Sequence, residues 1–118
     1  MEKKEIVKIL NEIGLLLELK GENPFKSRAY YNAARIIELL DEDIETIVKE
    51  DRLKDIKGIG EALNKKITEL VLTGKLKYYE DLKASIPEGL IDMLKIPGLG
   101  PKRIRTIYEQ LNITSVRE

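Results

Sequence analysis

Apolar residues recur at helical spacing in the first third of the chain. One series stops before Gly21 and predicts a first helix, with apolar positions at Ile6, Ile9, Leu10, Ile13, Leu16 and Leu17. Asn23-Pro24 is typical of the N-cap and first position of a second helix. We expect the buried stripe of that helix to consist of Phe25, Ala29, Ala33, Ile36, Ile37 and Leu40.

The remaining pattern predicts five further helices. The first starts with Asp41-Glu42-Asp43 and runs to about Lys49, with its carboxylates in the favourable first turn. A longer one ends at Gly74 and has apolar positions at Leu63, Ile67, Leu70 and Val71. Two short helices follow over 76–84 and 88–94, and Pro101 opens the last, with apolar positions at Ile104, Ile107, Tyr108 and Leu111.

No segment alternates in the manner of a β-strand, so the chain is predicted to be all-α. We place a first domain at residues 1–84 and a smaller helical unit at 85–118. Thr114-Ser115-Val116-Arg117-Glu118 is similar to the capping start of another helix, which suggests that a longer protein continues here.

Two pentapeptides repeat one pattern, in which an apolar residue precedes two glycines that flank a second apolar residue. They are Ile56-Lys57-Gly58-Ile59-Gly60 and Ile96-Pro97-Gly98-Leu99-Gly100, and each precedes a predicted helix. Glycine permits a tight backbone turn and close approach of a ligand, and the following helix offers free amides to a phosphate. Units of this kind are helix-hairpin-helix motifs, so we expect sequence-independent, salt-sensitive binding to a nucleic-acid backbone.

Composition narrows the chemistry that the chain can perform. The sequence contains no Cys and no His, which excludes thiol nucleophiles, zinc ribbons and Ser-His-Asp triads. Formal net charge is zero, but residues 1–53 carry 9 basic and 12 acidic side chains, whereas 54–118 carry 12 and 9. The basic excess therefore accompanies the two glycine motifs. With no transmembrane-length apolar run and no signal peptide, we expect a cytoplasmic protein that does not bind membranes. We also expect a monomer.

Basic side chains surround both motifs and complete the expected phosphate contacts. Lys54, Lys57, Lys65 and Lys66 flank the first, and Lys95, Lys102, Arg103 and Arg105 flank the second. We expect DNA contacts from Lys57, Gly58, Ile59, Gly60, Lys65, Gly98, Leu99, Gly100, Lys102 and Arg103.

Several motifs together resemble the amino-terminal lyase-type domain of X-family DNA polymerases, in its bacterial and archaeal branch. They are Phe25-Lys26-x-Arg28-Ala29-Tyr30, the first glycine motif, Lys66-Ile67 and Thr73-Gly74-Lys75-Leu76. The second glycine motif matches the start of the family's next subdomain. The resemblance implies DNA repair as the setting and gapped, nicked or 5′-phosphorylated duplex DNA as the partner.

The family resemblance also implies individual roles. Lys66 would attack the aldehyde of a 5′-deoxyribose phosphate and form a Schiff base, for which the neighbouring charge of Lys65 favours the free amine. Lys26 would hold the 5′-phosphate, and Tyr30 would orient the lysine and the sugar. The chain departs from the family pattern at Ala62 and Tyr78, where the family has basic residues.

No cofactor is required by these roles, but the resemblance implies a Na⁺ or K⁺ ion in each hairpin when DNA is bound. Backbone carbonyls would hold these ions, those of Lys54, Ile56 and Ile59 in the first and of Leu94, Ile96 and Leu99 in the second.

Two other functions stay open on the sequence. A tandem helix-hairpin-helix module of another repair protein would bind the DNA backbone without catalysis, and a helical adaptor would bind proteins instead. Asp41-Glu42-Asp43 has the spacing of a two-metal site but lies at a helix start, where acids are favoured for another reason. We therefore expect no polymerase activity from this chain alone.

Overall fold

The computed structural model describes residues 1–111, which form seven α-helices, one 3-10 helix over Leu53–Asp55 and no strand. The α-helices are α1 (Lys3–Lys20), α2 (Pro24–Glu38), α3 (Ile44–Lys49), α4 (Glu61–Thr73), α5 (Lys77–Ala84), α6 (Glu88–Met93) and α7 (Pro101–Leu111). This confirms the all-α prediction; the interpretation of Thr114–Glu118 lies outside the described residues. No helix within residues 1–111 is long and apolar enough to cross a membrane.

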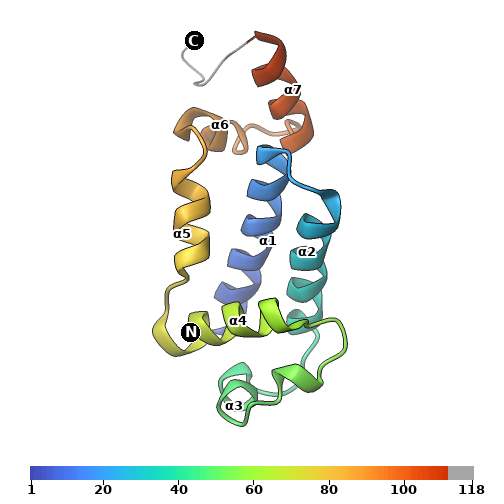
Figure 1. Ribbon diagram of the computed structural model, residues 1–118, viewed down its shortest axis with the longest axis vertical. Helices are drawn as coiled ribbons and strands as arrows, with labels where there is room; N and C mark the ends of the chain where they lie inside the picture. The colour runs from blue at the N-terminus through green and yellow to red at the C-terminus, as the bar shows by residue number, and fades with distance from the viewer. Residues whose placement is uncertain (112–118) are drawn as a thin grey trace.

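Helices α1 and α2 lie side by side and form the frame on which the others are placed (Figure 1). Helix α4 crosses the end of this pair at which α1 begins, and α5 returns along α1. Helices α6 and α7 lie near the opposite end, where α1 finishes. The division between residues 84 and 85 stays a prediction.

Helix ends follow the local signals in the sequence. Gly21 and Gly74 end α1 and α4 with left-handed backbone, at φ +80° and +78°. The Asn23 side chain accepts a hydrogen bond of 2.9 Å from the Phe25 amide and caps α2, while Pro24 is the first helical residue. Pro101 likewise opens α7. These boundaries confirm the predicted ones to within a few residues.

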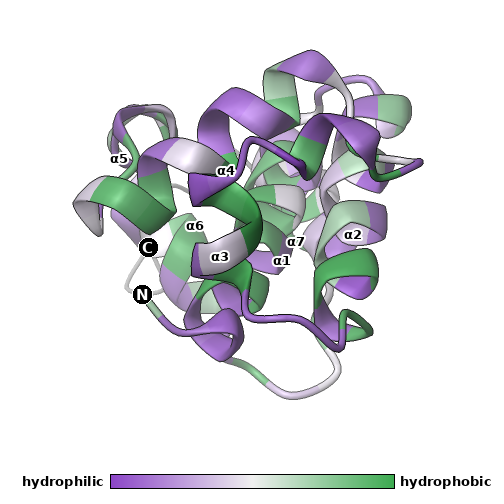
Figure 2. Cartoon of the chain, turned by 90° about the horizontal axis from the view of Figure 1, so that it is seen from below, coloured by the Kyte–Doolittle hydropathy of each residue, from purple (hydrophilic) through white to green (hydrophobic). Residues whose placement is uncertain are grey.

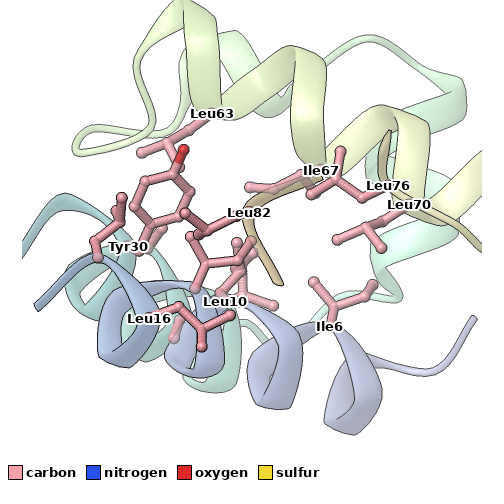
Figure 3. Packing of buried hydrophobic residues seen from close by; sticks show 14 of the residues in the cluster. Ile6, Leu10, Leu16, Tyr30, Leu63, Ile67, Leu70, Leu76 and Leu82 are labelled. Carbon is pink, nitrogen blue, oxygen red and sulfur yellow. The ribbon is translucent and has the colours of Figure 1, made fainter. Parts of the chain in front are cut away.

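One apolar cluster joins the four longest helices of the first 84 residues. Figure 3 shows Leu63, Ile67 and Leu70 of α4 directed toward α1 and α2, where Ile6 and Leu10 face them. Hydrophilic residues cover much of the outer surface of the helices (Figure 2). The cluster fixes α4, which carries several of the predicted site residues.

The predicted buried face of α2 is wrong at its start, because Phe25 is 74% exposed. The helix instead buries the face with Ser27, Tyr30, Ala33, Ala34 and Ile37. Ser27 can occupy this buried face because its hydroxyl donates a hydrogen bond of 3.0 Å to the Pro24 carbonyl, so the buried donor has a partner within α2. Phe25 projects from the other side of the helix, with the Arg28 guanidinium 5.5 Å from its ring centre.

Arg105 attaches α7 to the end of α1. Its Nη1 donates to the Leu19 carbonyl at 3.2 Å, and its Nε pairs with Glu109 at 2.9 Å. The guanidinium packs over Gly21, where a Cβ would overlap it. Arg105 therefore satisfies a carbonyl of the last turn of α1, a structural role for one of the cations around the second glycine motif.

Gly21→Ala is expected to destabilise the fold more than Gly74→Ala. Both glycines have left-handed backbone, for which alanine costs about 1 kcal/mol or more. An added Cβ meets nothing within 4 Å at Gly74 but overlaps Arg105 at Gly21, so Gly21→Ala also loosens α7. Urea unfolding of the two variants measures the difference, and equal losses would contradict the role of Arg105.

Candidate functional site

The two glycine motifs have the same backbone geometry. Gly58 and Gly98 have φ of +97° and +80°, in the left-handed region that favours glycine. The residue after each donates its amide to the carbonyl three positions earlier, Ile59 to Ile56 and Leu99 to Ile96, both at 3.1 Å. Each pentapeptide is therefore a tight turn, as the repeat predicts.

The second glycine of each motif stands directly before a helix. Gly60 precedes Glu61, the first residue of α4, and Gly100 precedes Pro101, the first of α7. The first-turn amides of each helix have no partner within their own helix, and the helix dipole gives this end a partial positive charge. Helix starts of this kind are suited to binding an anion such as a phosphate.

The internal packing of the protein does not require glycine at 60 or 100. Neither has positive φ, and a Cβ added to either would meet no atom within 4 Å. Residues with side-chain oxygens are at least as good at a helix N-cap as glycine. Both turns thus keep clear the space directly in front of their helix amides.

The two turns differ in how firmly the core anchors them. In the first, Ile59 is buried, and the Ile36 side chain fills the space beside Gly58, 2.5 Å from where a Cβ would lie. In the second, Leu99 is half-buried and Ile96 is 44% exposed. The expectation that apolar residues fix both turns to the core therefore applies fully to the first turn alone.

A pocket of about 420 Å³ lies beside the start of α4. It is lined by Lys26, Ala29, Tyr30, Gly60, Glu61, Ala62, Leu63, Lys66 and Tyr78. The structure thus brings together the three side chains to which the sequence assigns lyase roles, Lys26, Tyr30 and Lys66. It places them next to the last residue of the first glycine turn.

Tyr30 is the most buried polar side chain of the pocket. Its hydroxyl lies beside Leu63 at the edge of the core (Figure 3). Burial, with a smaller contribution from the neighbouring Tyr78, raises the pKa of Tyr30 above its ordinary value. The hydroxyl therefore stays neutral near pH 7 and can donate a hydrogen bond, which suits an orienting residue and excludes a phenolate base.

The two adjacent lysines of α4 have different surroundings. The Lys66 Nζ lies 4.6 Å from the centre of the Tyr78 ring, at the pocket. Lys65 is exposed, does not line this pocket, and pairs with Glu61 at 3.5 Å. The charge of Lys65 is thus partly balanced by the neighbouring carboxylate.

The contact that Tyr78 makes with Lys66 was not predicted from the sequence, where Tyr78 was noted only as a departure from the basic residue of the family. The signal that was present is an aromatic residue near the start of α5, which directly follows the helix that carries Lys66. Local patterns do not reveal the contact, because the two residues lie 12 positions apart in the sequence, on either side of the Gly74 turn.

The remaining predicted cations lie away from this pocket. Lys57 is exposed in the first turn, and Lys102 and Arg103 are exposed in the first turn of α7. The two glycine turns lie toward opposite ends of the α1–α2 pair (Figure 1). Lys102 also lines a second pocket of about 330 Å³, where α7 meets the junction of α1 and α2.

The prediction that the acidic run forms the first turn of a helix is wrong for Asp41 and Glu42, because α3 begins at Ile44. Asp43 is the N-cap residue of α3, and Glu42 accepts a hydrogen bond from Arg52 at 3.1 Å. Hydrogen bonding and the charge of Arg52 lower the pKa of Glu42. Within residues 1–111, no group of three or more acidic, His or Cys side chains is placed to hold a metal ion.

Comparison with known proteins places this architecture in a family. The model of the helix-hairpin-helix domain matches residues 1–76, which include the first glycine turn and the pocket helix α4. The chain belongs to the helix-hairpin-helix domain family. A second model, the SAM-like helix-hairpin-helix tandem, matches residues 90–118 and includes the second turn.

Relatives extend this assignment over nearly the whole chain. It is 38% identical over 113 residues to the DNA polymerase/3′-5′ exonuclease PolX of Bacillus subtilis (strain 168), covering 96% of this chain and 19% of that protein. It is 31% identical over 108 residues to DNA polymerase lambda of Arabidopsis thaliana, covering 91% and 20%. The chain spans about a fifth of the length of these curated relatives. These matches confirm the resemblance to X-family DNA polymerases.

Proposed function

We propose that this chain binds the phosphate backbone of DNA independently of sequence and that its pocket receives the 5′ end at a gap or nick. The supporting observation is that Gly60 and Gly100 have ordinary backbone and open surroundings. Two glycines that the fold does not require, each before a helix start, leave room for two backbone phosphates. The names of the two relatives, both DNA polymerases, agree with DNA as the partner.

Carbonyl groups at the same turns suit a monovalent cation, which we include in the proposal. The Ile56 and Ile96 carbonyls each accept one amide hydrogen bond within the turn, and a carbonyl has two lone pairs. The carbonyls of Lys54, Ile56 and Ile59, and those of Leu94, Ile96 and Leu99, would hold Na⁺ or K⁺ between turn and phosphate. The ion would offset the negative charge of the phosphate.

The pocket beside the first turn supports a lyase step within this proposal. The Lys66 amine attacks the C1′ aldehyde of an opened 5′-deoxyribose phosphate, and loss of water gives the Schiff base. Loss of the C2′ proton to solvent then breaks the bond from C3′ to the DNA phosphate, and water releases the sugar from the lysine. Lys26 lies in the same pocket and would hold the 5′-phosphate. Tyr30 also lines the pocket, and its neutral hydroxyl would orient the sugar.

A second function, backbone binding without catalysis, is favoured by two other residues of the pocket. Ala62 and Tyr78 line it where the resembled family has basic residues, so fewer cations face a 5′-phosphate. The proposed function requires a preference for a 5′-phosphate and a covalent adduct at Lys66, whereas backbone binding alone requires neither.

Gly60→Ser and Gly100→Ser are expected to weaken DNA binding while the fold stays intact. Serine is a good N-cap residue, and its Cβ meets nothing in the protein. Its side chain would occupy the phosphate space and compete for the helix amides, which costs about tenfold in affinity per turn. Fluorescence anisotropy with a gapped duplex measures the loss, and urea unfolding checks the fold. Unchanged affinity in both variants would contradict phosphate binding at the turns.

A 5′-phosphate at the gap is expected to raise affinity about tenfold, because Lys26 and Lys66 gain a charged partner. Binding isotherms at several salt concentrations should show log K falling with log salt at a slope of about −2 if two phosphates are held. Lys26→Gln should remove most of the 5′-phosphate preference, and the exposed α1 residue Lys8, changed to Gln, serves as control. A steep salt slope without any 5′-phosphate effect favours backbone binding alone.

Lys66→Arg is expected to bind gapped DNA but to form no covalent adduct. Arginine keeps the positive charge but does not act as an amine nucleophile, so contact and chemistry are separated. Borohydride trapping on DNA with a 5′-deoxyribose phosphate measures the adduct, and Lys8→Ala should trap as the unchanged chain does. An adduct of equal yield in Lys66→Arg would rule out Lys66 as the nucleophile.

A further inference from the structure

Tyr78 is fixed in place by two neighbouring helices. It is the second residue of α5, and the amide of the first residue, Lys77, donates to the Glu69 carboxylate of α4 at 2.8 Å. Its ring stacks on that of Tyr30 from α2, with ring centres 6.1 Å apart and planes 7° apart. This separation and angle fall within the favourable range for offset aromatic pairs. The position of the ring is therefore set by α4 and α2 together.

The Lys66 ammonium lies over the face of this fixed ring. The Nζ lies 4.6 Å from the ring centre, within the range of a cation–π interaction. Among the residues that the structure describes, Lys66 forms no salt bridge, whereas Lys65 pairs with Glu61 at 3.5 Å. The ring, rather than a carboxylate, is thus what positions Lys66.

A ring and a carboxylate differ in what they require of a lysine. A salt bridge depends on the ammonium charge and is lost when the amine gives up its proton. An aromatic face also packs against the methylene groups of lysine, which do not depend on charge. A lysine on a ring can therefore keep its place in either protonation state, as a Schiff-base nucleophile needs.

We propose that Tyr78 is the positioning residue for Lys66, holding its amine beside Tyr30 at the pocket. This inference rests on the proposed lyase function for its effect on reaction rate, but the positioning itself concerns the free protein. Tyr78 takes this role at a place where the resembled family has a basic residue. The aromatic ring of Tyr78 positions the amine of Lys66, whereas Lys26 and the first glycine turn would bind the negatively charged phosphate.

Three variants separate placement from general loss of a tyrosine. Tyr78→Phe keeps the ring, and Tyr78→Leu removes it. Tyr79→Leu is the matched control, because Tyr79 is the next residue of α5 and has the Lys83 Nζ 5.0 Å from its own ring centre, outside the pocket. Urea unfolding establishes that each variant is folded.

The first measurement is the NMR shift of the Lys66 ε-methylene in protein with ¹³C-labelled lysine, assigned by its disappearance in Lys66→Arg. A ring above the amine shifts this signal upfield in the unchanged chain, in Tyr78→Phe and in Tyr79→Leu. The upfield shift is expected to vanish in Tyr78→Leu. An unaltered Lys66 signal in Tyr78→Leu would overturn the proposal without reference to any catalytic activity.

The second measurement is the rate of borohydride trapping on DNA with a 5′-deoxyribose phosphate. Tyr78→Leu should lower this rate by roughly two- to fivefold, the factor of a partly exposed cation–π contact, with DNA affinity unchanged. Tyr78→Phe should restore it, and Tyr79→Leu should leave it unchanged. If Tyr78→Leu traps at the full rate, positioning fails and the lyase proposal stands. If the ring shift is present but the unchanged chain forms no adduct, the lyase proposal fails and positioning stands.

Discussion

The helical register of α4 is the constraint on which the site depends, because buried and site residues alternate along this one helix. Leu63, Ile67 and Leu70 point into the core, and Ile67 is fully buried. Lys66 directly precedes Ile67, so a change of register by one residue would rotate its charged side chain toward the core. Burying an unpaired ammonium is costly, whereas burying an isoleucine is favourable. The burial that closes the core therefore also places Lys66 at the pocket.

Local signals in the sequence predicted the helix boundaries. Contacts between residues distant in sequence determine which face of each helix is buried. Gly21, Gly74 and Pro101 act through their own backbone, so their effect is readable without knowledge of neighbours. The buried face of α2 is not local. Ser27 fits in the interior because its hydroxyl is satisfied within α2, and this leaves Phe25 on the outside. Hydrophobicity alone ranks these two residues in the opposite order.

The same distinction applies to the candidate site. The glycine turns were predictable because their geometry resides in five consecutive residues. The pocket members Lys26, Tyr30 and Lys66 came from resemblance to a family rather than from physical reasoning about spacing. The contact of Tyr78 with Lys66 needed the tertiary structure, since it depends on how α5 returns from Gly74 past α4.

The two turns share one backbone shape but not one mode of attachment. The first is held by buried Ile59, so it cannot move without opening the core that also holds α4, the helix of Lys66. The second belongs to a segment attached through the Arg105 guanidinium and the buried side chains of Ile104 and Met93, while the apolar residues of the turn itself, Ile96 and Leu99, stay partly exposed. The second turn therefore has less apolar contact of its own with the core than the first. Because the first turn and Lys66 share a support, a phosphate bound at that turn would hold a fixed position relative to the amine, as the proposed lyase step requires.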